Sequence, residues 1–159
     1  MVSLQGALAG GFIGTLVLTT GLRAATELRL TRIDLPFLLG TVFTADRTRA
    51  RALGYALHFL FGLLFAGAYY LVFAALDQAS WWLGALFGVA HSLFAATALV
   101  SVLLPLVHPR MGTQFSAADS APLLEPPGFM LLNYGASTPI VMLVTHVIYG
   151  AIVGAAAAT

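Results

Sequence analysis

Three histidines lie inside three different long apolar stretches of this 159-residue chain: His58, His91 and His146. An ionisable ring placed in hydrocarbon needs a partner, so a histidine within a membrane is a candidate for a functional site. Neutral imidazoles bind iron, copper and zinc, and histidines also carry protons. Each ring alone is explained by a local hydrogen bond to a threonine or serine, but three rings on three helices indicate a shared site.

A transition-metal site is the first hypothesis for these rings. It takes His58, His91 and His146 as nitrogen ligands and Glu27, at the end of the first apolar stretch, as an oxygen ligand. This ligand set is of the type that binds iron, copper or zinc. The alternative for Glu27 is a helix-end ion pair with Arg23 or Arg29.

Haem b is the second candidate cofactor, with His58 and His146 as axial ligands. Each of these histidines is followed four residues later by a glycine, Gly62 or Gly150. Residues four apart share one face of a helix, so each ring would lie beside a bare patch of backbone. Two such rings on facing helices suit a flat macrocycle between them, in the way that bundle cores hold cofactors.

The elements that must position these rings are membrane helices. Apolar residues make up 60% of the chain and charged residues 8%, and crossing a bilayer takes about 20 apolar residues. We predict spans at residues 4–22, 52–76, 81–107 and 137–158. With short connections they form one all-α transmembrane domain over residues 1–159, an up-down four-helix bundle in which the second and fourth spans face each other.

The arginines predict the orientation. Six of the seven lie between the first and second spans, and Arg110 lies between the third and fourth. By the positive-inside rule both connections are cytoplasmic, and both termini lie on the non-cytoplasmic side. Asp34 followed by Pro36 predicts the capped start of a short helix on the membrane surface.

The second connection is rich in proline and cannot be a continuous helix. Its apolar residues predict a cap over the cytoplasmic mouth of the bundle. We expect Glu125 to hold this cap down by pairing with Arg110 or with an arginine of the first connection. His108, where the third span ends, is expected to act as a helix-end cation or to face lipid phosphates.

Four segments resemble a family of small four-span bacterial integral membrane proteins: residues 33–41, 108–111 (His-Pro-Arg-Met), 124–129 (Leu-Glu-Pro-Pro-Gly-Phe) and 133–135 (Asn-Tyr-Gly). The resemblance covers nearly the whole chain. It implies the same topology and a bacterial cytoplasmic membrane. That family has no assigned activity, so the resemblance carries over no functional residue.

Several function classes are excluded or left open by composition. Seven basic and six acidic residues give no field for binding nucleic acid, and the lack of cysteine removes thiolate sites. No phosphate-binding loop or Ser-His-Asp order is present, so the sequence leaves open whether the protein is an enzyme.

We expect a membrane protein that binds a transition metal or haem, with redox activity as an option. The alternatives are a small proton or ion pathway, or an accessory or assembly subunit of a larger membrane complex, pigment- or cofactor-containing in one version. A partner subunit or a second copy would then contact Gly6, Gly10 and Gly14.

Overall fold

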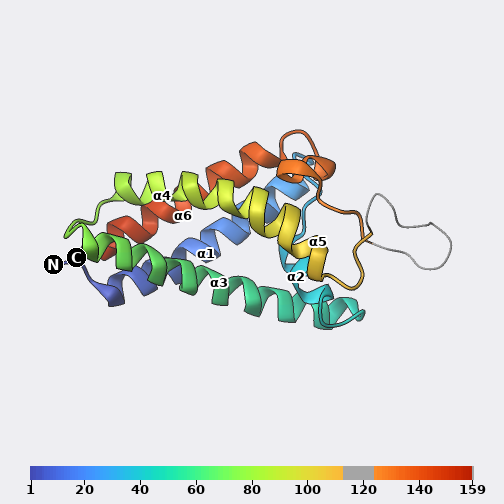
Figure 1. Cartoon of the computed structure of the whole chain (residues 1–159), viewed down its shortest axis with the longest axis horizontal. Helices are drawn as coiled ribbons and strands as arrows, with labels where there is room; N and C mark the ends of the chain where they lie inside the picture. Colours follow the sequence, from blue (N-terminus) through green and yellow to red (C-terminus); the bar gives the residue numbers. More distant parts are fainter. Residues whose placement is uncertain (113–123, 159) are drawn as a thin grey trace.

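The computed structural model describes residues 1–112 and 124–158, and within them the long elements are all helical (Figure 1). Four stretches are long and apolar enough to cross a membrane: α1 (Leu4–Glu27), α3 (Arg47–Ala75), the continuous run Trp81–Val107, and α6 (Thr138–Ala157). They lie side by side. Both termini lie at one end, where the Ser3 N–H donates to the Ala157 carbonyl at 2.9 Å (Figure 1).

Helix ends follow their capping residues. The side chains of Ser3, Asp46 and Ser80 accept backbone N–H groups at the starts of α1, α3 and the third long stretch. Such caps satisfy donors that have no partner within the helix. The four predicted spans are all found as helices, with α1 continuing to Glu27 and α3 beginning at Arg47.

The third long stretch is not a plain α-helix. It passes from α4 (Trp81–Phe94) into a π-helix, η1 (Ala95–Leu103), and ends as α5 (Leu104–Val107). The Ser101 hydroxyl lies 2.5 Å from the Ala96 carbonyl, five residues back, and 2.7 Å from the Gly128 carbonyl. Pro105 has no backbone N–H to donate to the Ser101 backbone carbonyl, so one α-helical hydrogen bond is absent from this turn. A π segment is uncommon and is frequently found at functional sites.

Small residues set how closely the long helices pack. Gly6 and Gly10 lie against Ala156 and Val153 of α6, so a Cβ added at either glycine would come within 3.0 Å of α6 atoms. Gly14 packs in the same way against Tyr149. The three glycines expected to contact a partner therefore contact α6 of the same chain. A partner subunit or second copy would have to use another face.

A short helix, α2 (Leu35–Thr41), follows α1, as the sequence predicts. The Asp34 carboxylate accepts the Phe37 N–H at 3.0 Å, which confirms Asp34 as its N-cap. Gly40 and Gly54 let α2 press onto α3, since a Cβ at Gly54 would overlap the Pro36 carbonyl. α2 lies at the end of the molecule opposite the termini (Figure 1).

The segment 124–137, here called the cap, lies at this same end. It contains a 3₁₀ helix, η2 (Phe129–Tyr134), in which Met130 and Leu131 adopt positive φ angles of 50° and 66°. Such angles are strained for side chains of this size. Leu131 is completely buried, and burial of its side chain offsets part of that strain.

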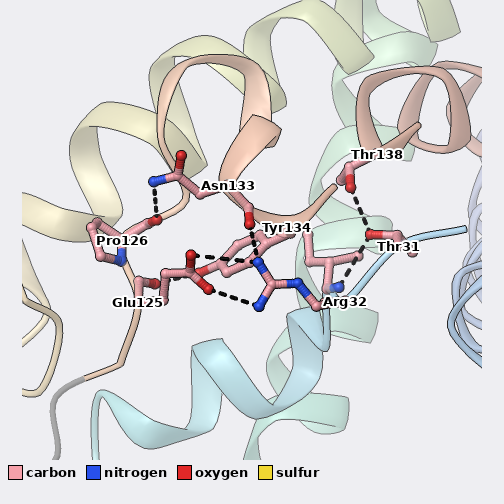
Figure 2. Close-up of polar contacts among 8 residues, drawn as sticks. Thr31, Arg32, Glu125, Pro126, Asn133, Tyr134 and Thr138 are labelled. Atoms are coloured by element: carbon pink, nitrogen blue, oxygen red, sulfur yellow. Dashed lines mark hydrogen bonds and ion pairs between the residues drawn. The ribbon is translucent and has the colours of Figure 1, made fainter. Parts of the chain in front are cut away.

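Arg32 ties the cap to the segment between α1 and α2 (Figure 2). Its guanidinium lies 3.1 Å from a Glu125 carboxylate oxygen and also donates to the Asn133 carbonyl. Its backbone N–H donates to the Tyr134 carbonyl at 2.8 Å, and the Tyr134 hydroxyl donates to the Glu125 carbonyl at 2.7 Å. The expected pairing of Glu125 with an arginine of the first connection is confirmed, and that arginine is Arg32.

His108 is not the helix-end cation that the sequence predicts. It is buried, and its Nε2 lies 3.1 Å from the Leu38 carbonyl and 3.2 Å from the Thr41 hydroxyl, while its Nδ1 accepts the Arg110 N–H at 3.1 Å. Burial lowers the pKa of His108, and the nearby Arg110 charge lowers it further, against a raising effect of the bond to Leu38. His108 therefore acts as a neutral link between α2 and the end of the third long stretch.

Candidate functional site

A cavity of about 480 Å³ lies between the long helices, and His58, His91 and His146 all line it. We call it the histidine cavity. Its wall includes residues of all four long stretches and of α2, and apart from the histidines, Thr15 and Tyr149 it is made of apolar residues and glycine. Three imidazoles thus meet in a space with almost no other polar group.

His58 comes from α3 and is buried. Its Nδ1 lies 3.3 Å from the Thr19 hydroxyl of α1. That hydroxyl lies 2.6 Å from the Thr15 carbonyl and has a single hydrogen to give, which the carbonyl takes. The Thr19 oxygen therefore accepts from Nδ1–H, and the neutral ring keeps a lone pair on Nε2.

His146 comes from α6 and, like His58, carries its ring hydrogen on Nδ1. Its Nδ1 lies 2.8 Å from the Met142 carbonyl, one turn back in the helix. A carbonyl only accepts hydrogen bonds, so Nδ1 carries the hydrogen. Nε2 of His146 is left with its lone pair.

His91 comes from α4 and has the opposite tautomer. Its Nδ1 lies 3.3 Å from the Tyr69 hydroxyl of α3, and in the described part of the chain this hydroxyl has no other hydrogen bond. With the Tyr69 hydroxyl as the donor, Nδ1 accepts, and on this basis we assign the ring hydrogen to Nε2. The ring is held between Phe65, stacked at a centroid distance of 3.7 Å, and His146 at 4.7 Å.

The three Nε2 atoms are not fully buried. None takes part in a hydrogen bond within residues 1–112 and 124–158. In these residues every buried side-chain nitrogen or oxygen has a hydrogen-bond partner. Since the three Nε2 atoms have no such partner, they are not enclosed by protein. The cavity therefore presents two lone pairs, from His58 and His146, and one N–H, from His91.

Glu27 does not join the histidines. It forms an ion pair with Arg23 on the same helix, its side chain is 63% exposed, and it does not line the cavity. This is the helix-end pair that the sequence offered as the alternative. In the part of the chain that the structure describes, no three histidine or acidic side chains are grouped closely enough to hold one metal ion.

The glycine gaps that the haem hypothesis requires are filled. A Cβ at Gly62 would meet the Thr15 hydroxyl, and a Cβ at Gly150 would meet the Gly84 carbonyl. Both glycines serve close contact between helices instead of leaving bare backbone beside a ring.

Two tyrosines of the site were missed by the sequence analysis. Tyr69 holds His91, and the Tyr149 hydroxyl donates to the Gly62 carbonyl at 2.5 Å. Both lie at helical spacing from a histidine, since Tyr69 follows His58 by three turns and Tyr149 follows His146 by about one turn. That shared-face spacing was the signal available in the sequence.

One side of the cavity reaches the outer surface of the molecule. α3 and α4 contact each other through aromatic rings: the ring centroid of Phe87 lies 5.5 Å from that of Tyr69 and 5.2 Å from that of Phe73. Several side chains of the cavity wall are also exposed, such as Leu64 of α3 at 60% and Val107, at the end of the third long stretch, at 67%. We call Phe61, Leu64, Leu103 and Val107 the rim.

The chain has no match among the family models, the curated proteins or the solved structures with which it was compared.

Proposed function

We propose that this protein binds a small lipid-soluble molecule in the histidine cavity, within the membrane. Binding sites for small molecules are concave and mostly apolar, with a few placed polar groups, and have volumes of roughly 300–1,000 Å³. The cavity of about 480 Å³, with three imidazole nitrogens in an apolar wall, has this character. The exposed rim supports access from the bilayer rather than from water.

The proposed setting is the bacterial cytoplasmic membrane, with the long helices as an up-down bundle. Six arginines lie between the last turns of α1 and the first turns of α3, at the end that also carries α2 and the cap (Figure 1). The positive-inside rule favours this end as cytoplasmic, with α2 on the membrane surface and both termini on the far side.

The test is a search for a bound molecule in protein purified from its native membrane. Mass spectrometry of an organic extract is compared between wild type, Ala95→Phe and Ala90→Phe. Ala95 lines the cavity, and a phenyl group there fills part of it, whereas Ala90 is exposed on the same helix. We expect one lipid-soluble compound in wild type and in Ala90→Phe, and its loss in Ala95→Phe. Equal amounts in all three would contradict the proposal.

A transition metal is the second candidate ligand. His58 and His146 both line the cavity, and each gives its Nδ1 hydrogen to an oxygen and keeps a lone pair on Nε2. Metal-binding histidines have this arrangement, with the second nitrogen held by a carbonyl or hydroxyl oxygen. A small ion such as iron, copper or zinc fits this arrangement better than haem does, because both glycine gaps are filled.

Elemental analysis of His58→Ala and His146→Ala tests the metal proposal. Each change should lower bound metal relative to wild type, while His108→Ala, outside the cavity, should not. Metal content unaffected by either cavity change would exclude it. The accessory-subunit and proton-pathway hypotheses stay predictions, and no contact of the described residues favours either.

A further inference from the structure

We infer that the ligand of the histidine cavity is a neutral molecule with a hydroxyl head on an apolar body, and that it reaches the cavity from the bilayer across the rim. This inference rests on the proposed binding function. It narrows the ligand class from three properties of the cavity: charge, hydrogen-bond polarity and the direction in which it opens.

The charge of the cavity excludes an ionic head. Within the described part of the chain, no arginine, aspartate or glutamate lines it. A carboxylate or phosphate placed there would lose its hydration without a fixed counter-charge, and that cost is large in an apolar site. A fatty acid or a phospholipid head is therefore a poor occupant.

The hydrogen-bond polarity distinguishes between neutral heads. With the tautomers assigned above, Nε2 of His58 and of His146 can accept hydrogen bonds, and Nε2–H of His91 can donate one. A ketone or quinone oxygen only accepts, so it could use His91 alone and would leave both lone pairs without partners. A hydroxyl group donates one hydrogen bond and accepts others, so it can satisfy a lone pair and the N–H together.

The shape of the cavity places the apolar body. From the histidines the lining continues toward α2 through Leu99, Leu103 and Leu104 to Leu35 and Leu39, which are all apolar. Leu103 and Val107 of the rim lie along this same part, at the α2 end of the third long stretch, whereas Phe61 and Leu64 follow His58 on α3. A hydroxyl head at the histidines and an apolar body beside the rim fit these walls and let the molecule arrive from the lipid.

Two kinds of molecule share this chemistry: a ring phenol, including a quinol, and a long-chain alcohol. The test uses the full chain in lipid nanodiscs and tritiated 4-nonylphenol, counted against empty nanodiscs. Unlabelled 4-nonylphenol, its methyl ether and farnesol serve as competitors. The ether keeps the ring and the tail but has no hydrogen to donate, so it is the matched control for the hydroxyl.

We expect saturable binding of the phenol, with the ether weaker by about tenfold or more because a histidine lone pair loses its donor. At least one of His146→Phe and His58→Phe should lower the affinity for the phenol and reduce its advantage over the ether, because the single hydroxyl hydrogen goes to one of the two lone pairs. Competition by farnesol as strong as by the phenol would point to an alcohol, and its failure to compete would point to a ring phenol. The thermal midpoint of each variant reports whether it still folds.

Two results would overturn the inference, and they separate it from the proposed function. Equal competition by the phenol and the ether, with binding lost in Ala95→Phe, would contradict the hydroxyl head and leave the cavity as a binding site. Binding unchanged in Ala95→Phe would contradict both. If neither the phenol nor farnesol binds above empty nanodiscs, the hydroxyl class is excluded.

Discussion

His91 and His146 lie edge to face, with ring centroids 4.7 Å apart and planes at 84° to each other. They come from α4 and α6, which approach closely because Gly84 and Gly88 pack against the backbone of α6. A Cβ on Gly88 would come within 2.3 Å of the His146 carbonyl oxygen. The meeting of the two rings therefore depends on a glycine three residues before His91.

The first prediction concerns this glycine. Gly88→Ala should destabilise the protein by about 1–3 kcal/mol, since the added methyl group forces α4 away from α6. Gly67→Ala is the matched control, because a Cβ there meets nothing within 4 Å. It removes a glycine from a helix and should be neutral or stabilising by up to about 1 kcal/mol. Thermal unfolding in one detergent measures both. Equal effects of the two changes would contradict the role given to Gly88.

The second prediction concerns the attachment of the cap. Arg32→Ala removes the contacts to Glu125 and to the Asn133 carbonyl, so backbone amides of residues 124–137 should exchange hydrogen faster. Its effect on overall stability should stay within about 1 kcal/mol, because the Arg32 and Glu125 side chains are largely exposed.

Hydrogen exchange followed by mass spectrometry makes this measurement peptide by peptide. Arg49→Ala, an exposed arginine on α3, is the control and should leave the cap unchanged. Cap exchange that is as slow in Arg32→Ala as in wild type would show that other contacts hold the segment.

The third prediction is a pH dependence at His108. Its pKa in the folded protein is lowered by burial, so the unfolded chain, with an ordinary histidine pKa of about 6.5, binds a proton more readily. The stabilising contribution is thus complete above about pH 6.5 and is lost as pH falls toward the lowered pKa. Protonation would also place an Nδ1–H against the Arg110 N–H, which Nδ1 now accepts.

The measurement is the thermal midpoint between pH 8 and pH 5 for wild type and His108→Gln. We expect the midpoint to fall more steeply in wild type, and the difference between the two curves isolates His108 from the other histidines. Parallel curves would show that His108 makes no pH-dependent contribution.

Local patterns in the sequence were sufficient to predict much of this architecture. Apolar length predicts the four membrane-length helices, and Asp34 with Pro36 predicts the start of α2, because both signals act within a few residues. The ion pair between Arg23 and Glu27 is likewise a spacing of four on one helix. The three histidines, selected from the sequence as residues that could share a site, all line the histidine cavity.

The features that the sequence did not reveal depend on contacts between distant segments. In the π-helix, the Ser101 hydroxyl contacts the Gly128 carbonyl of the cap, 27 residues further along the chain. Glycine spacing shows where a helix surface has no side chain, but not which residue fills that space. Gly62 and Gly150 therefore suggested gaps for haem, whereas Thr15 fills the space at Gly62 and Gly84 fills the space at Gly150. The role of His108 was missed for the same reason, because its hydrogen-bond partners Leu38 and Thr41 lie on α2, far from it in the sequence.

The ring tautomers give the most direct test of the site. The chain has four histidines, so ¹⁵N spectra of histidine-labelled protein in bilayers can be assigned with single His→Phe variants. We predict neutral rings with hydrogen on Nδ1 of His58 and His146 and on Nε2 of His91, and, when 4-nonylphenol is added, a shift of the Nε2 signals of His91 and of at least one of the other two rings. Identical tautomers at the three sites, or signals that ignore the added phenol, would contradict a shared hydroxyl-binding cavity.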